Sequence, residues 1–296
     1  MASVYDTNKS KSSKIFQILL TIFFIIVSFV CLFPFLNEIA ISLSSPESIM
    51  SGMVTLIPVG TNWGAYSKVI GNPGFIKSFN FTVVMTFIYT LLTMAMTIIA
   101  AYPLSKKELK GRGVIMALII FTMYFDGGII PNYLIVKNIG LLDSIWSLIL
   151  PGAISAYNLI ILRSFFNGID KSLTESAYLD GCTEIGILLR IVIPLSAPAI
   201  ATLSLFYAVG RWNGFSDAVF YISDSKKFPL QLKLREMILM EQISQQEANQ
   251  GASAGKSIAD SVKAASVILT TIPILLVYPF LQKYFTKGIM LGSVKG

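Results

Sequence analysis

The sequence contains no histidine, only two cysteines and little charge. Without histidine there is no imidazole general base, which excludes the common serine and cysteine hydrolase arrangements and most zinc sites. Cys31 and Cys182 provide no disulfide framework, and the topology derived below places the first in a membrane span and the second outside it. These absences argue against a membrane-embedded enzyme and against a metal centre.

Charged residues make up 13% of the 296 residues and hydrophobic residues 54%. Soluble domains carry roughly 25% charged residues, so about half of the usual solubilising charge is missing here. This composition indicates that lipid is the solvent. The formal net charge of +7 fits the basic residues that orient a membrane protein better than it fits binding to nucleic acid.

Long uncharged stretches predict an all-α integral membrane protein with six transmembrane helices. About 20 apolar residues cross the roughly 30 Å hydrocarbon layer, and five stretches of 19 to 28 uncharged residues suffice. A sixth stretch, 113–125, becomes long enough if its helix continues past Asp126 into "GGIIPNYLIV". A tail, 1–14, thus precedes a single transmembrane domain, 15–296. The expected spans cover about 15–36, 79–104, 113–133, 144–163, 192–214 and 264–284.

The positions of basic residues predict the orientation. Four Lys or Arg residues occur in "SKKELKGR", 105–112, and further lysines lie near both ends of the chain. With six spans these all fall on one side, which the positive-inside rule assigns to the cytoplasm. Both termini and a segment at 170–194 are then cytoplasmic, while 215–263 forms an outer loop. The first apolar run is too long for a signal peptide and lacks a cleavage site, so it is expected to remain as a span.

The cytoplasmic segment "SLTESAYLDGCTEIGILLRIVIP" begins at Ser172. Ser172 and Glu175 have the spacing of a capping box, which predicts a helix start. Asp180 and Glu184 are like charges four residues apart that a cationic partner would offset. Pro194 is expected in the first turn of the fifth span. One helical face would carry Leu173, Ala177, Gly181, Ile185 and Leu188.

Such a helix suits docking into a groove on another protein. The alternative is a helix that lies on the lipid surface. Acidic side chains fit poorly against an anionic inner leaflet, so the docking interpretation is favoured.

The same segment resembles the EAA loop of ABC-importer permeases, EAA-x3-G-x9-I-x-LP. Glu175-Ser176-Ala177, Gly181, Ile191 and Ile193-Pro194 match its spacing, with Ser176 in place of alanine and Ile193 in place of leucine. "WNGFSDAVFYI" and the ending "TKGIMLGSVKG" resemble the carbohydrate-type members. "GGIIPNYLIVKNIGLLDSIWSLILPGAISAYNLIILRSFF" is similar to their LplC/YtcP-like branch.

The resemblance implies a type I ABC-importer permease (MetI-like) fold in the bacterial cytoplasmic membrane, with no cofactor and a saccharide as substrate. It implies a heterodimer with a second homologous permease subunit, two copies of an ABC ATPase subunit and an extracytoplasmic solute-binding lipoprotein. In related maltose-type permeases the loop before the last span probes the binding protein; here that loop, 240–258, does the same or is simply solvated. The residues implied in coupling to the ATPase are Glu175, Ser176, Ala177, Asp180, Gly181, Ile191 and Pro194.

Sugar translocation needs aromatic faces and amide groups within the spans. The candidates are Asn158, Tyr207, Trp212 and Asn213, although aromatic residues near span ends also serve as interface anchors. Arg211 and Asp217 are expected at the outer water boundary. The outer basic residues, which fit an acidic glycan or an acidic binding protein equally well, are Lys226, Lys227, Lys233 and Arg235.

A near-match to a phosphate loop occurs at "QGASAGKS", 250–257, where Gln250 stands in place of the first glycine. The chain is therefore expected to have no ATP site, to be no enzyme by itself and to depend on separate ATPase subunits. The main alternative is a secondary carrier of a small polar solute. Such carriers show inverted repeats and buried ionisable residues for ion coupling, whereas the charges here lie at the ends of the expected spans.

Overall fold

The computed structural model describes residues 11–248, 260–277 and 279, most of which are helical, with no β-strand among them. The predicted all-α class is therefore confirmed over this part of the chain. The chain divides into two compact units, which are treated separately below. The first consists of Met1–Gly71 with Ile238–Leu269, and the second of Asn72–Met237 with Thr270–Gly296.

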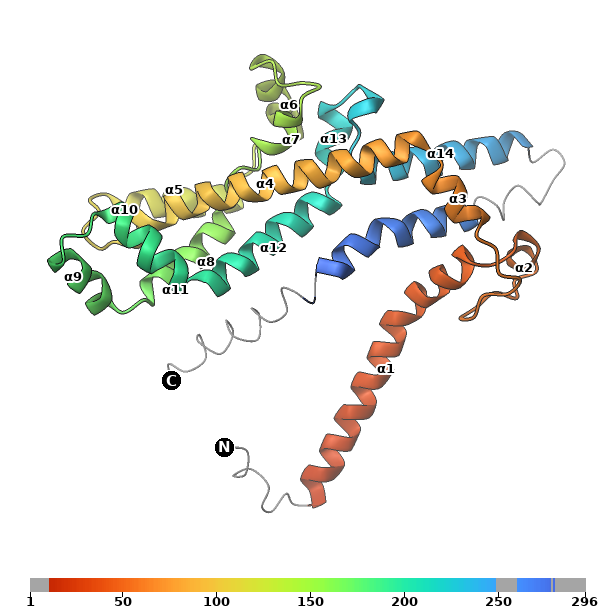
Figure 1. Cartoon of the computed structure of the whole chain (residues 1–296), viewed down its shortest axis with the longest axis horizontal. Coiled ribbons are helices and arrows are strands. Elements are labelled where there is room, and N and C mark those ends of the chain that lie inside the picture. Colours follow the sequence, from red (N-terminus) through yellow and green to blue (C-terminus); the bar gives the residue numbers. More distant parts are fainter. Residues whose placement is uncertain (1–10, 249–259, 278, 280–296) are drawn as a thin grey trace. The chain divides into compact units, whose positions relative to one another are not determined.

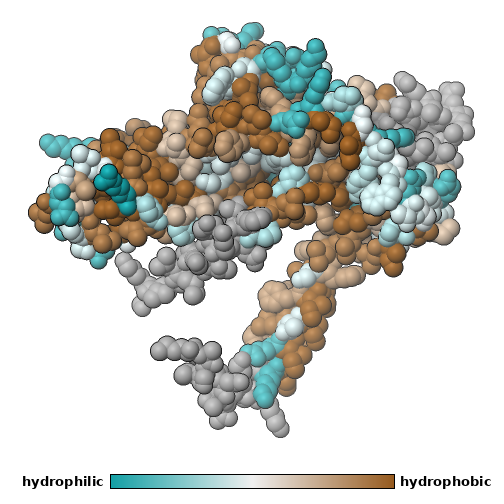
Figure 2. Space-filling view, in the orientation of Figure 1, coloured by the Kyte–Doolittle hydropathy of each residue, from teal (hydrophilic) through white to brown (hydrophobic). Residues whose placement is uncertain are grey.

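In the first unit, a long helix is followed by a folded connection. Helix α1 (Lys11–Ser42) continues through Pro34 well beyond the expected end of the first span (Figure 1). Its phenylalanine, isoleucine and valine side chains are largely exposed, which is the pattern expected of a helix that faces lipid (Figure 2). Short helices α2 (Pro46–Met50) and α3 (Gly64–Ile70) follow.

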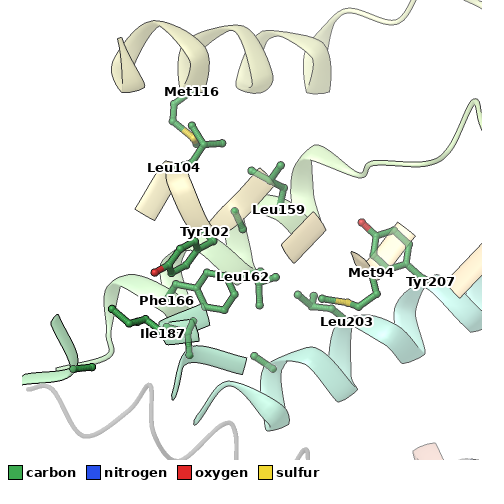
Figure 3. Close-up of a cluster of buried hydrophobic side chains, with 14 residues drawn as sticks. Met94, Tyr102, Leu104, Met116, Leu159, Leu162, Phe166, Ile187, Leu203 and Tyr207 are labelled. Carbon is green, nitrogen blue, oxygen red and sulfur yellow. The ribbon is translucent and has the colours of Figure 1, made fainter. Parts of the chain in front are cut away.

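The second unit is built around helix α4 (Pro73–Ser105). Asn72 caps its N-terminus by accepting hydrogen bonds from the amides of Gly74 and Phe75, and Pro73 suits the first turn, where no intrahelical donor is needed. Helix α4 packs against α8 (Ala156–Asn167) and α12 (Ala197–Asn213). The core between them contains Met94, Tyr102, Leu159, Leu162, Leu203 and Tyr207 (Figure 3).

The third expected span, 113–133, is not one continuous helix. It is divided between α5 (Arg112–Tyr124) and α6 (Ile129–Asn138), whose axes differ by 113°. At the break Asp126 Oδ1 accepts from the amide of Gly128, whose φ is +85°. Glycine adopts this left-handed conformation without the Cβ clash that other residues suffer, so the turn is favoured over a continued helix.

The fourth and fifth expected spans are also interrupted. In 144–163, α7 (Ile145–Ile149) is separated from α8 by "LPGAIS", in which Pro151 has no amide hydrogen to continue the helical hydrogen bonds. At the start of the fifth, the helical stretch Glu184–Leu195 meets α12 at 81°. Among the described residues, three helices are long and apolar enough to cross a membrane, or up to five if each bent pair is one span.

The expected outer loop, 215–263, is largely helical where it is described. It contains α13 (Ser216–Tyr221), the 3-10 helix η2 (Ser225–Lys227) and α14 (Leu230–Ala248). The α14 side chains Leu230, Leu232 and Leu234 are buried, so the start of this helix packs against the protein on more than one side. The segment 250–257, which nearly matches a phosphate loop, lies outside the described residues. So does most of 278–284 in the sixth expected span. The described part of that span belongs to the helix Asp260–Val277.

Candidate functional site

Helix α9 (Lys171–Leu179) opens the segment that resembles the EAA loop, and Asp170 caps it. Asp170 Oδ1 accepts from the Ser172 amide at 3.0 Å, so the predicted Ser172–Glu175 capping box is wrong. Ser172 instead lies in the first turn, where its carbonyl accepts a hydrogen bond from Ser176 Oγ. Aspartate is as good an N-cap as serine, and here it precedes the expected start by two residues.

Gly181 ends this helix in a tight turn. Its φ is +80°, and its amide donates to the Tyr178 carbonyl at 3.0 Å while the Cys182 amide donates to Ala177 at 2.9 Å. This is the left-handed glycine termination common at helix ends. The expected single helical face is therefore wrong: Ala177 is 7% exposed, whereas Ile185, beyond the turn, is 70% exposed.

After the turn the chain re-enters the core in three short steps. These are α10 (Glu184–Ile187), capped by Thr183, the π-helix η1 (Leu188–Val192) and α11 (Ile193–Leu195). Ile191 packs against the core, while Pro194 lies in α11, before the 81° bend. The long helix of the fifth expected span is α12, which begins at Ala197 and has Pro198 in its first turn. Pro194 is therefore not the first-turn proline of this helix.

The exposed part of the segment contains most of the residues assigned to coupling. Glu175, Ser176 and Asp180 are exposed, and Gly181 shapes the turn beside them. Ala177 faces inward and contacts the core. A side-chain Cβ added at Gly181 would meet nothing within 4 Å, so only its backbone conformation requires glycine.

A cluster of four polar side chains joins this segment to α4. The Glu184 carboxylate accepts from Tyr102 Oη at 2.6 Å and from the Tyr178 hydroxyl, and it lies 3.5 Å from Lys106 Nζ. The Lys106 ammonium also lies over the rings of Tyr102 and Tyr178, at 4.8 and 5.5 Å. We call these four residues the Glu184 cluster.

The electrostatics of the cluster favour an ionised carboxylate. Partial burial alone would raise the pKa of Glu184, but hydrogen bonds from both tyrosines and the charge of Lys106 hold this pKa below its usual value. Burial and the hydrogen bond to Glu184 raise the pKa of Tyr178 to about 12. Glu184 is therefore charged and Tyr178 neutral at physiological pH.

A groove of about 720 Å³ lies beside the cluster, between the end of α4, the start of α5, the end of α8, and α9. Both basic and acidic side chains line its wall. Those bearing charge are Lys106, Lys107, Glu108, Arg112, Lys171, Glu175 and Glu184.

The four candidate residues of the substrate pathway do not form one site. Tyr207 and Asn158 are buried; the Tyr207 hydroxyl lies 2.7 Å from Thr97 Oγ1 and accepts from the Ser155 amide at 3.2 Å. Trp212 is also buried, and its indole nitrogen donates to the Thr270 carbonyl at 3.1 Å. Asn213 is exposed and donates to Val209 in its own helix.

Arg211 is buried inside the protein, and its place at the outer water boundary stays a prediction. Only 7% of it is exposed, and its guanidinium bonds both oxygens of Asp217, at 2.5 and 2.9 Å, and the Leu148 carbonyl. It also lies 5.9 Å from the Tyr89 ring. Arg211 thus ties the end of α12 to α4, α7 and α13, a role that its position in the sequence did not reveal.

A stripe of threonines along α4 was missed by the sequence analysis. Thr82, Thr86, Thr93 and Thr97 are buried, and Thr90 lies beside them on the same face of the helix. Among the described residues the hydroxyls of Thr86 and Thr90 have no hydrogen-bond partner, although buried threonines in helices often bond a carbonyl one turn earlier. The spacing of three and four residues was the signal available in the sequence. No group of three or more potential metal ligands occurs in the part of the chain that the structure describes.

The family model described as "Binding-protein-dependent transport system inner membrane component" matches residues 82–291, which include most of α4, the Glu184 cluster and α12. The chain belongs to this family. This transport-permease family accounts for the apolar helices, and the expected membrane location is confirmed.

Two relatives from Bacillus subtilis (strain 168) match over nearly the whole chain. The polygalacturonan/rhamnogalacturonan transport system permease protein YtcP is 44% identical, over 96% of this chain and 99% of its own. Protein LplC is 41% identical over 100% of both chains. These matches confirm the expected likeness of this permease to sugar-transport permeases.

A solved structure has the same fold. It is a chain of a bacterial ABC transporter involved in the import of the acidic polysaccharide alginate, with a TM-score of 0.85 and 32% identity. The match covers 94% of this permease and 99% of that chain. The bent helices described above thus belong to an ABC-importer permease fold.

Proposed function

We propose that this permease is one half of the translocation pathway of an ATP-driven importer for oligosaccharides derived from acidic polysaccharides. The observation that carries the proposal is the 44% identity to a polygalacturonan/rhamnogalacturonan permease over almost the full length of both chains. The likeness to a component of an alginate importer supports an acidic substrate independently.

The proposed topology has six spans, with both termini and the segment around Gly181 in the cytoplasm. The bent pair α5–α6 and the pair α7–α8 then provide the third and fourth spans. Non-helical backbone at membrane depth is tolerated only where it is buried in protein or faces water, so a second permease subunit would cover these breaks.

Coupling to two ATPase subunits would occur through the exposed part of α9 and its glycine turn. Glu175, Ser176 and Asp180 present polar side chains there, and the ATPase groove would supply the positive charge that offsets them. Ile191 and Pro194 lie in the return path to the core, where they would hold the segment in place. An extracytoplasmic binding protein would deliver the saccharide on the opposite side.

The substrate pathway is proposed to run beside the threonine face of α4. Unpaired hydroxyls at Thr86 and Thr90 can donate to sugar oxygens, and Tyr207 and Tyr89 lie in ring contact with each other, 6.1 Å apart. Asn158, Trp212 and Asn213 remain further candidates. The outer lysines are partly engaged within the chain, since Lys227 bonds the Asp143 carbonyl and Lys233 pairs with Glu236, so they need not be the source of substrate preference.

The test is reconstitution of the permease with its partner permease, ATPase subunits and binding protein in liposomes. We expect ATP-dependent uptake of labelled oligogalacturonide and little uptake of a neutral oligosaccharide of equal length. Omission of the ATPase subunits should abolish uptake, and an imposed proton or sodium gradient should not restore it. Uptake that follows the ion gradient without ATP would instead identify a secondary carrier.

A further inference from the structure

The Glu184 carboxylate follows the glycine turn, and it binds one group that precedes the turn and others at the end of a distant helix. Tyr178 precedes the turn, Glu184 follows it, and Tyr102 belongs to the last turns of α4, 82 residues away in sequence. Both carboxylate oxygens accept a tyrosine hydroxyl. Hydrogen bonds to an ionised group are shorter and about twice as strong as neutral ones, so this carboxylate fixes the turn relative to α4.

The ion pair with Lys106 contributes less to this geometry than the hydroxyls do. The Glu184 side chain is 55% exposed, and the charges lie 3.5 Å apart, where solvent screens the attraction. The ammonium nevertheless sits over both tyrosine rings. Lys106 therefore helps to hold the two rings against the carboxylate.

Helix α4 extends from this cluster to the residues proposed to line the substrate pathway. Thr97 precedes Tyr102 by five residues, or about 7.5 Å along the axis at 1.5 Å per residue, and its hydroxyl lies 2.7 Å from that of Tyr207. The helix is continuous between the two contacts. A displacement of its end at Tyr102 would thus be felt at Tyr207.

We propose that Glu184 is a positioning residue, which ties the glycine turn to α4 so that movement of the turn is transmitted along this helix to the substrate pathway. The proposal rests on the function proposed above. It differs from the coupling role of Glu175 and Asp180, because Glu184 is directed at its own chain and both of its oxygens are already bonded there. Loss of the tie should leave the ATPase docked but less able to drive transport.

The experiment compares the complete reconstituted importer with Tyr102→Phe, Glu184→Gln and the double variant. Tyr102→Phe removes one hydroxyl and keeps the ring. Tyr124→Phe, which changes an exposed tyrosine at the end of α5, is the matched control. The readouts are sugar transported per ATP hydrolysed, basal ATP hydrolysis, and the amount of ATPase that co-purifies with the permease.

We expect each single variant to lower sugar transported per ATP by about threefold or more, with the double variant no worse than the more affected single one. Basal hydrolysis and co-purified ATPase should stay at wild-type levels, as should every readout of Tyr124→Phe. Wild-type transport per ATP in both single variants would overturn the proposal. The proposal would also be overturned if the loss of transport per ATP in the double variant equalled the product of the two single losses. The same holds if the loss in each variant matched its loss of co-purified ATPase.

The failure of the proposed function would look different. In that case the wild-type complex itself would show no ATP-dependent uptake of saccharide. Failure of the positioning role requires a wild-type importer that transports and variants that transport equally well.

Discussion

Replacing Gly181 by alanine should weaken coupling through the backbone alone. The φ of +80° is left-handed, and this region costs a residue with a Cβ about 1–2 kcal/mol relative to glycine. Nothing lies within 4 Å of the added methyl group, so no clash adds to that cost. The turn should therefore lose about five- to thirtyfold in population relative to other conformations.

The assay is ATP-dependent uptake in the reconstituted importer, with ATP hydrolysis measured in parallel. We expect Gly181→Ala to lower sugar transported per ATP several-fold and Gly181→Asn to lower it less, because asparagine tolerates the left-handed region. Gly113→Ala is the control, since Gly113 lies in α5 with open space around it and ordinary helical φ. Equal transport per ATP in wild type, Gly181→Ala and Gly181→Asn would refute the reasoning.

Three further predictions concern other parts of the second unit. Thr86→Val should lower oligosaccharide uptake without reducing ATPase binding, because it removes an unpaired buried hydroxyl and keeps the shape; unchanged uptake would contradict a substrate role. Arg211→Gln should destabilise the permease by about 1–3 kcal/mol in thermal unfolding, with partial recovery in Arg211→Gln/Asp217→Asn, because the single change leaves a partly buried carboxylate unpaired. Because the pKa of Tyr178 is raised to about 12, the neutral hydroxyl of Tyr178 stabilises the fold fully below about pH 10, the ordinary tyrosine pKa. This stabilisation is lost as the pH rises toward about 12. Tyr178→Phe should therefore remove one alkaline transition from a tyrosinate absorbance titration.

The sequence located the exposed segment but not its shape. Periodicity placed Leu173, Ala177 and Ile185 on one helical face because a 3.6-residue pattern passes over a single glycine unnoticed. The left-handed conformation of Gly181 divides that face. The N-cap was misassigned for a related reason: Asp170 and Ser172 are both good caps, and only the backbone shows which one precedes the first turn.

The six spans were predicted from hydropathy, which carries no information about the direction of a helix; the described residues give three candidate spans, or up to five if each bent pair is one span. Residues 113–133 are apolar enough, yet Gly128 turns the chain between α5 and α6. Proline at 151 similarly separates α7 from α8. Hydropathy measures the solvent that a segment prefers, whereas glycine and proline decide whether it is straight.

The contacts that matter most in the candidate site are remote in sequence. Tyr102 reaches Glu184 across 82 residues, and Arg211 reaches the Leu148 carbonyl across 63. Periodicity and motif spacing report on neighbours within a few turns. The Glu184 cluster and the burial of Arg211 therefore became visible only with the fold.

The most direct test of the coupling role is the side of the membrane on which the glycine turn lies. A single cysteine would replace Leu179, which is 90% exposed, in a chain carrying Cys31→Ser and Cys182→Ser; Met53→Cys in the same background marks the opposite side. An impermeant thiol reagent should label position 179 only in inside-out vesicles and position 53 only in intact cells. Added ATPase subunits should block the labelling of position 179. Labelling of position 179 in intact cells would contradict the account.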